Sequence, residues 1–173
     1  MLSSLIQLDG SILLWIQNTL RNEYLTSFFR MITKLGDKGL IWILIVIGLL
    51  CFKKTRPTGI MVSFALILSW AISNMLIKNL VARIRPYEVI NGLHNLIERQ
   101  PDFSFPSAHT SSSFAAAAIL YKELPKKYGI TVVILAVLIS FSRLYLGVHY
   151  PSDVLGGALI GILIAVVVRK GFK

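Results

Sequence analysis

The sequence contains few charged residues and a single cysteine. Only 15% of its 173 residues are charged and 55% are hydrophobic, whereas roughly 25% of a soluble globular domain is charged. Cys51 has no second cysteine with which to pair, so a disulfide within the chain is excluded. Acidic residues are also scarce, with 8 Asp and Glu against 18 Lys and Arg. This composition excludes a disordered chain and argues against a water-soluble fold.

The hydrophobic residues gather in long blocks, the pattern of a polytopic membrane protein. The blocks cover residues 39–52, 57–77, 103–121, 128–142 and 154–168. A helix needs about 20 residues to cross the hydrocarbon, so the second and third blocks are long enough by themselves. The last two lengthen if Arg143 and Asp153 lie inside the protein. We therefore predict an all-α membrane helix bundle of about six helices, five of them transmembrane.

Basic residues cluster after alternate blocks. The clusters are Lys53, Lys54 and Arg56; Lys122, Lys126 and Lys127; and Arg169, Lys170 and Lys173. Because cytoplasmic loops of membrane proteins carry such an excess of cations, we expect segments 78–102 and 143–153 to lie together on the other side. No basic run is interleaved with exposed aromatic residues, which argues against nucleic acid as a partner and leaves the membrane.

The first 36 residues have a different pattern. Their apolar residues recur at roughly helical spacing, while Gln17, Arg21 and Arg30 form a polar stripe. This pattern is typical of an amphipathic helix that lies in the membrane interface, and we favour it over a sixth span. Gly36 and Gly39 predict a turn into the first crossing. We accordingly divide the chain into an N-terminal segment, 1–36, and a transmembrane domain, 37–173.

Three cations are expected at membrane depth on the non-cytoplasmic side: Lys78, Arg85 and Arg143. An unpaired charge at that depth is costly and usually marks a binding site. Arginine presents a planar fork to phosphate oxygens and lysine a point charge, so the set suits a phosphoryl group better than a carboxylate. Snorkelling of each side chain to the headgroups is the alternative.

A helix start is expected on the same side. Ser107 follows a proline and precedes a long apolar stretch, so it reads as an N-cap. The amides of Ala108 and His109 would then be free donors at a helix N-terminus, where phosphate binds readily. His109, on the first turn of this helix, is expected to face the same anion.

A second histidine, His149, lies four residues before Asp153, and Pro151 between them favours a helix start. Asp153 could then accept a hydrogen bond from the imidazole Nδ1 and leave Nε2 as a nucleophile toward phosphorus. Capping of the helix is the alternative role for Asp153. A metal site is not expected, because the three cations would repel a dication and no close pair of histidines is present.

These residues resemble the signature of the type 2 phosphatidic-acid phosphatase superfamily of integral membrane lipid phosphatases. That signature is Lys, six residues, Arg-Pro; then Pro-Ser-Gly-His; then Ser-Arg, five residues, His, three residues, Asp. The matching residues are Lys78, Arg85, Pro86, Pro106, Ser107, His109, Ser142, Arg143, His149 and Asp153. The one departure is Ala108, where the family usually has glycine, and we expect a small adjustment of the loop there.

The resemblance implies a role for each position. His149 would be the nucleophile, Asp153 its orienting carboxylate, and His109 the general acid and then the general base. The residues implied to hold the phosphoryl oxygens are Lys78, Arg85, Ser107 and Arg143, beside the amide of Ala108. The resemblance implies neither a metal nor another cofactor.

The resemblance also implies a substrate and a place in the cell. Small bacterial members hydrolyse undecaprenyl diphosphate in the plasma membrane with an extracytoplasmic site, so that lipid is the favoured substrate. Phosphatidylglycerophosphate or phosphatidate is the alternative. A non-enzymatic transporter of lipids or anions, and a phosphotransferase that uses an acceptor other than water, are the alternatives from other classes.

Overall fold

The computed structural model describes residues 2–172, with side chains from residue 6 onward, and in that range the chain forms helices and no strand. The helices are α1 (Leu2–Leu20), α2 (Glu23–Gly36), the 3₁₀ turn η1 (Asp37–Gly39), α3 (Leu40–Cys51), α4 (Arg56–Trp70), the π-helical η2 (Ala71–Ile77), α5 (Lys78–Val81), α6 (Pro86–Val89), α7 (Ala108–Glu123), α8 (Lys126–Tyr145) and α9 (Pro151–Gly171).

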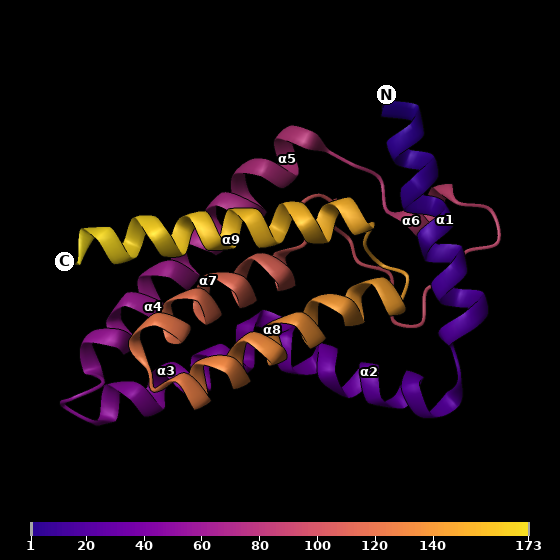
Figure 1. Ribbon diagram of the computed structural model, residues 1–173. Helices are drawn as coiled ribbons and strands as arrows, with labels where there is room; N and C mark the ends of the chain where they lie inside the picture. Colours follow the sequence, from indigo (N-terminus) through magenta and orange to yellow (C-terminus); the bar gives the residue numbers. More distant parts are fainter. Residues whose placement is uncertain (1, 173) are drawn as a thin grey trace.

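The long helices lie side by side in a bundle, and α1 lies across one end of it (Figure 1). α7 packs against α4, α8 and α9 and so forms the centre of the bundle. Small residues allow this close packing: Ala115, Ala116 and Ala117 of α7 are buried, and a Cβ on Gly161 of α9 would lie 2.4 Å from the Ser111 carbonyl oxygen. Backbone contact through small residues is the usual way in which membrane helices associate.

The outer surface of the bundle is apolar. Leucine, isoleucine and phenylalanine side chains on α3, α4 and α9 are exposed, among them Ile47, Phe64, Leu159 and Leu163. Of the helical segments described, three are long and apolar enough to cross a membrane by length and composition: Arg56–Val89, Lys126–Tyr145 and Pro151–Gly171. They correspond to the second, fourth and fifth hydrophobic blocks.

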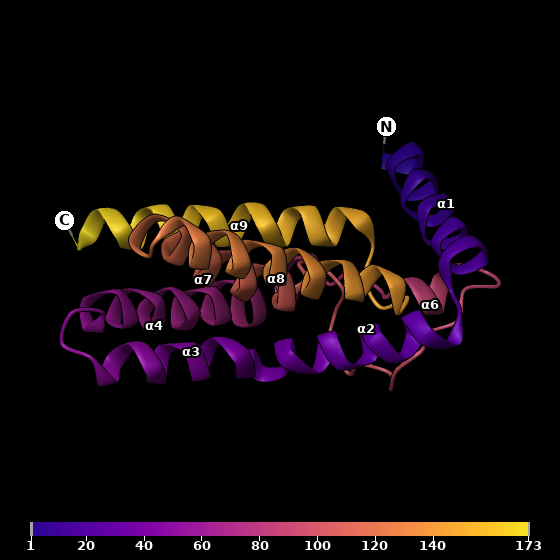
Figure 2. The same cartoon turned by 60° about the horizontal axis from the view of Figure 1, so that its bottom comes forward.

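The other two predicted crossings, α3 and α7, are shorter. α3 has 12 residues and α7 has 16, fewer than the roughly 20 that a crossing needs. α7 begins at Ala108 and not at the start of its hydrophobic block, because residues 103–107 form a loop. α2 runs in line with α3 across η1 and lengthens it (Figure 2). The five crossings therefore stay a prediction.

The N-terminal segment is divided into two helices, so the single amphipathic helix expected there is not confirmed. The chain bends at Arg21 and Asn22, and Asn22 caps α2 by accepting a hydrogen bond from the Leu25 amide, 2.9 Å away. α2 packs along α8, whereas α1 reaches the turn between α8 and α9. The predicted domain boundary at residue 36 falls at η1, and the division itself stays a prediction.

The helix that leads to Lys78 changes from α to π over residues 71–77. Two serines of this region, Ser69 and Ser73, each share a hydrogen bond with the buried hydroxyl of Ser111 on α7, at 2.8 and 2.9 Å. A π turn takes up more residues than an α turn, so it rotates the side chains that follow it relative to a straight α-helix. The π segment therefore helps to set the direction of Lys78.

Candidate active site

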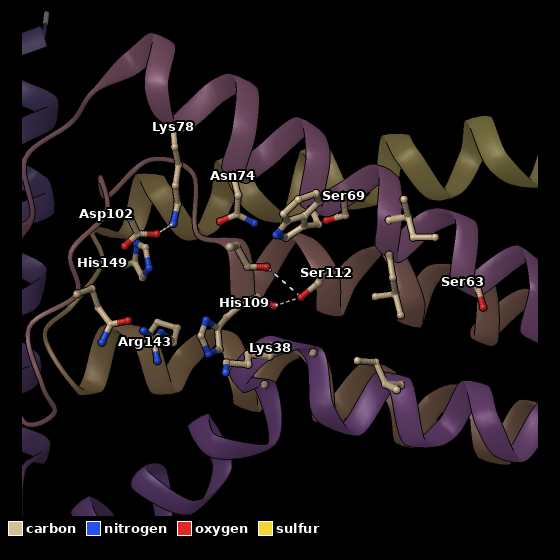
Figure 3. A pocket seen from close by; sticks show the side chains of 18 of the residues that line it. Lys38, Ser63, Ser69, Asn74, Lys78, Asp102, His109, Ser112, Arg143 and His149 are labelled. Carbon is tan, nitrogen blue, oxygen red and sulfur yellow. Dashed lines mark hydrogen bonds and ion pairs between the residues drawn. The ribbon is translucent and has the colours of Figure 1, made fainter.

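A cavity of about 720 Å³ opens in the bundle near the end where α1 lies (Figure 3). That volume is within the range of about 300–1,000 Å³ typical of ligand sites. Its charged and titratable lining residues are Lys38, Lys78, Arg85, Asp102, His109, Arg143 and His149. Apolar side chains of α3 and α4 continue the cavity toward the middle of the bundle, among them Ile43, Leu66 and Trp70. One end of the cavity is thus polar and the other apolar.

His149 lies on the turn between α8 and α9 and is only 2% exposed. Its Nδ1 is 3.4 Å from Oδ2 of Asp153, which the start of α9 at Pro151 places in the first turn of that helix. Its Nε2 lies 3.3 Å from Nη1 of Arg85. Burial lowers the pKa of His149 to about 3, although the Asp153 carboxylate opposes this shift. The imidazole is therefore neutral at physiological pH.

The Asp153 carboxylate is held by a dense set of donors. Oδ2 accepts hydrogen bonds from the Ser104 hydroxyl at 2.5 Å and from the Tyr150 amide at 2.9 Å, and Oδ1 accepts one from Arg83 at 2.6 Å. Arg83 also pairs with Asp9 of α1 at 2.8 Å. These contacts fix the carboxylate against His149. Asp153 itself lies behind the imidazole and does not line the cavity.

Lys78 and Arg85 both bind the carboxylate of Asp102. Arg85 donates to Oδ1 at 2.5 Å, and the ammonium of Lys78 donates to Oδ2. Partial burial alone would raise the pKa of the Asp102 carboxyl, but Lys78 and Arg85 outweigh this effect and hold that pKa below its usual range. Two of the three predicted cations are therefore paired with an ionised carboxylate that is itself 45% exposed.

Arg143, the third cation, is 1% exposed. Its Nη1 donates to the Thr33 hydroxyl at 2.5 Å. Its Nε is buried and has no hydrogen-bond partner among the described residues. A buried guanidinium N–H without an acceptor is costly, so this group is suited to an anion that enters the cavity.

The start of α7 supplies the second histidine. Ser107 is the N-cap: its hydroxyl accepts hydrogen bonds from the amide and the hydroxyl of Thr110, at 3.4 and 3.0 Å. Ser107 is buried and does not line the cavity. Ala108 begins the helix and, like His109, does line it. His109 Nε2 lies 2.9 Å from Oδ1 of Asp37.

The structure thus gathers most of the residues that the sequence singled out. Those that line the cavity are Lys78, Arg85, Ala108, His109, Arg143 and His149, while Ser107 and Asp153 support them from behind. Three contributors were missed: Asp102, Arg83 and Asp37. None of the three lies at a spacing that belongs to a motif. For Asp37 alone the sequence gives a hint of its place, because it lies in a predicted turn between Gly36 and Gly39.

A family model described as the PAP2 superfamily matches residues 58–173. That range contains every residue of the signature quoted above. The resemblance found in the sequence is therefore confirmed.

Individual proteins also match. An undecaprenyl-diphosphatase from Sulfolobus acidocaldarius is 36% identical over 121 residues, which are 70% of this chain and 58% of that protein. The undecaprenyl-diphosphatase BcrC of Bacillus subtilis is 34% identical over 144 residues, 83% of this chain and 72% of that protein. This chain thus spans little more than half of the first relative and about three quarters of the second.

A crystal structure matches nearly the whole fold. It is that of a transmembrane PAP2-type phosphatidylglycerolphosphate phosphatase from Bacillus subtilis, with a TM-score of 0.77 and 28% identity, over 95% of this chain and 84% of that one. Together with the long apolar helices, these relatives identify a multi-pass membrane protein.

Proposed function

Because the chain belongs to the PAP2 superfamily, we propose that it is a metal-independent membrane lipid phosphatase that works through a phosphohistidine intermediate. One observation carries the proposal: the buried imidazole of His149, the imidazole of His109 and the buried Arg143 line one cavity whose far end is apolar. A phosphate at the polar end and a lipid chain at the apolar end satisfy both environments.

The chemistry begins at His149. Asp153 favours the proton on Nδ1, so Nε2 carries the lone pair, which attacks phosphorus once Arg85, whose Nη1 lies 3.3 Å from Nε2, turns to the phosphoryl group. The bond from phosphorus to the departing oxygen breaks, and that oxygen takes its electron pair and a proton from His109. Water then attacks the phosphorus of the phosphohistidine while His109 accepts a proton from it. The bond from phosphorus to Nε2 breaks, its electron pair returns to His149, and inorganic phosphate leaves.

The cations and the helix start stabilise the charge that develops on the phosphoryl oxygens. Arg143 Nε needs no rearrangement, because no described residue accepts its hydrogen bond. Lys78 and Arg85 exchange Asp102 for the phosphoryl group. The Ala108 amide, at the N-terminus of α7, adds the helix dipole, and Ser107 keeps that end in place.

Undecaprenyl diphosphate is the substrate that we favour, because two relatives at 34% and 36% identity carry that activity in their names. The alternative is phosphatidylglycerophosphate or phosphatidate, on the likeness to the Bacillus subtilis phosphatidylglycerolphosphate phosphatase. A panel of these lipids, compared by kcat/KM, separates the two.

The purified protein in detergent is expected to release phosphate from a lipid phosphate in excess EDTA, because His149 is the nucleophile and no metal takes part. Vanadate, which mimics the five-coordinate transition state, is expected to inhibit this release. The measurement is free phosphate over time.

Two other classes of function give different results in that assay. A transporter of lipids or anions releases no phosphate in detergent. A phosphotransferase gives a phosphorylated acceptor in place of free phosphate, which product analysis with a labelled substrate detects. Loss of activity in EDTA that is restored by a divalent cation would contradict the metal-independent route.

We further propose five crossings in a bacterial plasma membrane, with the site on the extracytoplasmic side. The orientation follows from three basic segments: the turn between α3 and α4, the turn between α7 and α8, and the C-terminal end of α9. All three lie at the end of the bundle opposite α1 (Figure 1), and they carry Lys54, Lys126 and Lys170.

Single cysteines test this orientation. In a Cys51→Ser background, Asn91→Cys is expected to react with an impermeant maleimide in intact cells, whereas Lys126→Cys reacts only after the membrane is opened. Both original side chains are exposed. Labelling of both positions from the same side would overturn the topology.

A further inference from the structure

The turn between α2 and α3 brings a carboxylate into the candidate active site. At η1 two successive residues adopt the left-handed conformation, Lys38 with φ 52° and Gly39 with φ 73°. This conformation is strained for a residue other than glycine. The turn interrupts an otherwise continuous line of helix and lies directly beside the start of α7 (Figure 2).

Asp37, the first residue of this turn, contacts the second histidine of the site. Its Oδ1 lies 2.9 Å from Nε2 of His109, whose side chain is only 16% exposed. The neighbouring Gly36 permits the approach: a Cβ there would lie 2.7 Å from Cδ2 of His109 and 2.8 Å from Cγ2 of Ile139. A larger residue at position 36 would push the turn away from the imidazole.

Most of the other charges around His109 are positive. Lys78 and Arg143 line the same cavity, and each disfavours a protonated imidazole. An acid that must carry a proton in this setting needs a compensating carboxylate. Asp37 is in direct contact with the ring, whereas Asp102 is engaged by Lys78 and Arg85.

We propose that Asp37 is the positioning residue for His109, an inference that rests on the proposed phosphatase function. The carboxylate accepts the Nε2 hydrogen, which orients the ring and leaves Nδ1 for the departing lipid oxygen. As the bond between phosphorus and that oxygen breaks, the Nδ1 proton moves to the oxygen. Asp37 stabilises the imidazolium before this transfer and again after His109 has taken a proton from the attacking water. Asp37 thus has for His109 the role that Asp153 has for His149.

The test uses the difference between a poor and a good leaving group. An alkoxide needs a proton as it departs, whereas p-nitrophenolate does not. Asp37→Asn is therefore expected to lower kcat/KM for dioctanoyl phosphatidate by about 10²-fold, and to lower kcat/KM for p-nitrophenyl phosphate at least tenfold less. In a His109→Ala background, Asp37→Asn is expected to cause no further loss on either substrate.

Glu98→Gln is the matched control. Glu98 is exposed, lies on a neighbouring cavity that Asp37 also lines, and has no side-chain bond to His109. The Glu98→Gln substitution removes one negative charge from the same region, and its kcat/KM is expected to stay within about threefold of wild type for both substrates.

The outcomes separate this inference from the proposed function. If Asp37→Asn lowers kcat/KM equally for the two substrates, or for neither, the role of Asp37 is overturned. The proposed function still stands in that case, provided that phosphate release depends on His149. If the wild-type protein cleaves only diphosphates, the departing lipid phosphate needs no acid and His109 acts mainly as the base toward water. Asp37→Asn is then expected to slow hydrolysis of the phosphoenzyme, and unchanged hydrolysis would overturn this role. Release of phosphate by a His149→Ala protein overturns both.

Discussion

A His149→Ala protein is expected to release phosphate from a lipid phosphate at least about 10⁴-fold more slowly than the wild type, because the variant lacks the atom that attacks phosphorus. The loss is expected in kcat, while the variant still binds inorganic phosphate through Arg143 and Arg85. His149 is buried and its ring is held at Nδ1 by Asp153, so no neighbouring group can take its place. The measurement is single-turnover phosphate release at saturating enzyme.

The matched control is His94→Ala, which removes the exposed histidine of the loop before α7. It is expected to keep activity within about threefold. Because alanine at position 149 leaves a buried cavity, His149→Gln is measured as a second variant. The midpoint of thermal unfolding in detergent shows whether each variant is folded. A folded His149 variant that turns over at near wild-type rate would remove the nucleophile from the mechanism.

The second large effect is expected for Asp153→Asn, with a loss of about 10²–10⁴-fold in kcat. The carboxylate keeps the proton on His149 Nδ1, whereas an amide can stabilise the wrong tautomer. The amide NH₂ would also face donors, because Ser104, Arg83 and the Tyr150 amide all donate to Asp153. The measurement is kcat and KM on one lipid phosphate, with the expected change confined largely to kcat.

Asp9→Asn provides the comparison for that variant. Asp9 pairs with the same Arg83 but has no bond to His149, so it reports on the structural part of the network alone. Its turnover is expected to stay within about threefold of wild type. If Asp9→Asn and Asp153→Asn lose equal activity, the network is structural and the orienting role of Asp153 is wrong.

Much of the candidate site follows from local chemistry that the sequence displays. Ser107 before an apolar stretch predicts a helix start, and α7 begins there. Pro151 predicts the start of α9, which places Asp153 one turn after His149. The general architecture, an all-α membrane fold, follows from the hydrophobic blocks. These features depend on neighbours within a few residues, and so a single sequence contains them.

The missed features depend on distant parts of the chain. Arg83 joins Asp9 and Asp153, which lie 74 and 70 residues away. Asp102, in the loop between α6 and α7, pairs with Lys78 across 24 residues. The π-helical segment before Lys78 has no composition that distinguishes it from an α-helix. Such pairings follow from how the helices pack, which spacing along the chain does not encode.

The most direct test of the whole account is to trap the phosphoenzyme. Wild-type and His109→Ala proteins are mixed with p-nitrophenyl phosphate that carries a radiolabelled phosphate, quenched in alkali because phosphohistidine is labile to acid, and mapped by mass spectrometry. We predict a label on His149, at a higher level in the His109→Ala protein because water attack on the intermediate is slowed there. Label on another residue, or turnover by both proteins with no labelled enzyme at any time, would contradict the account.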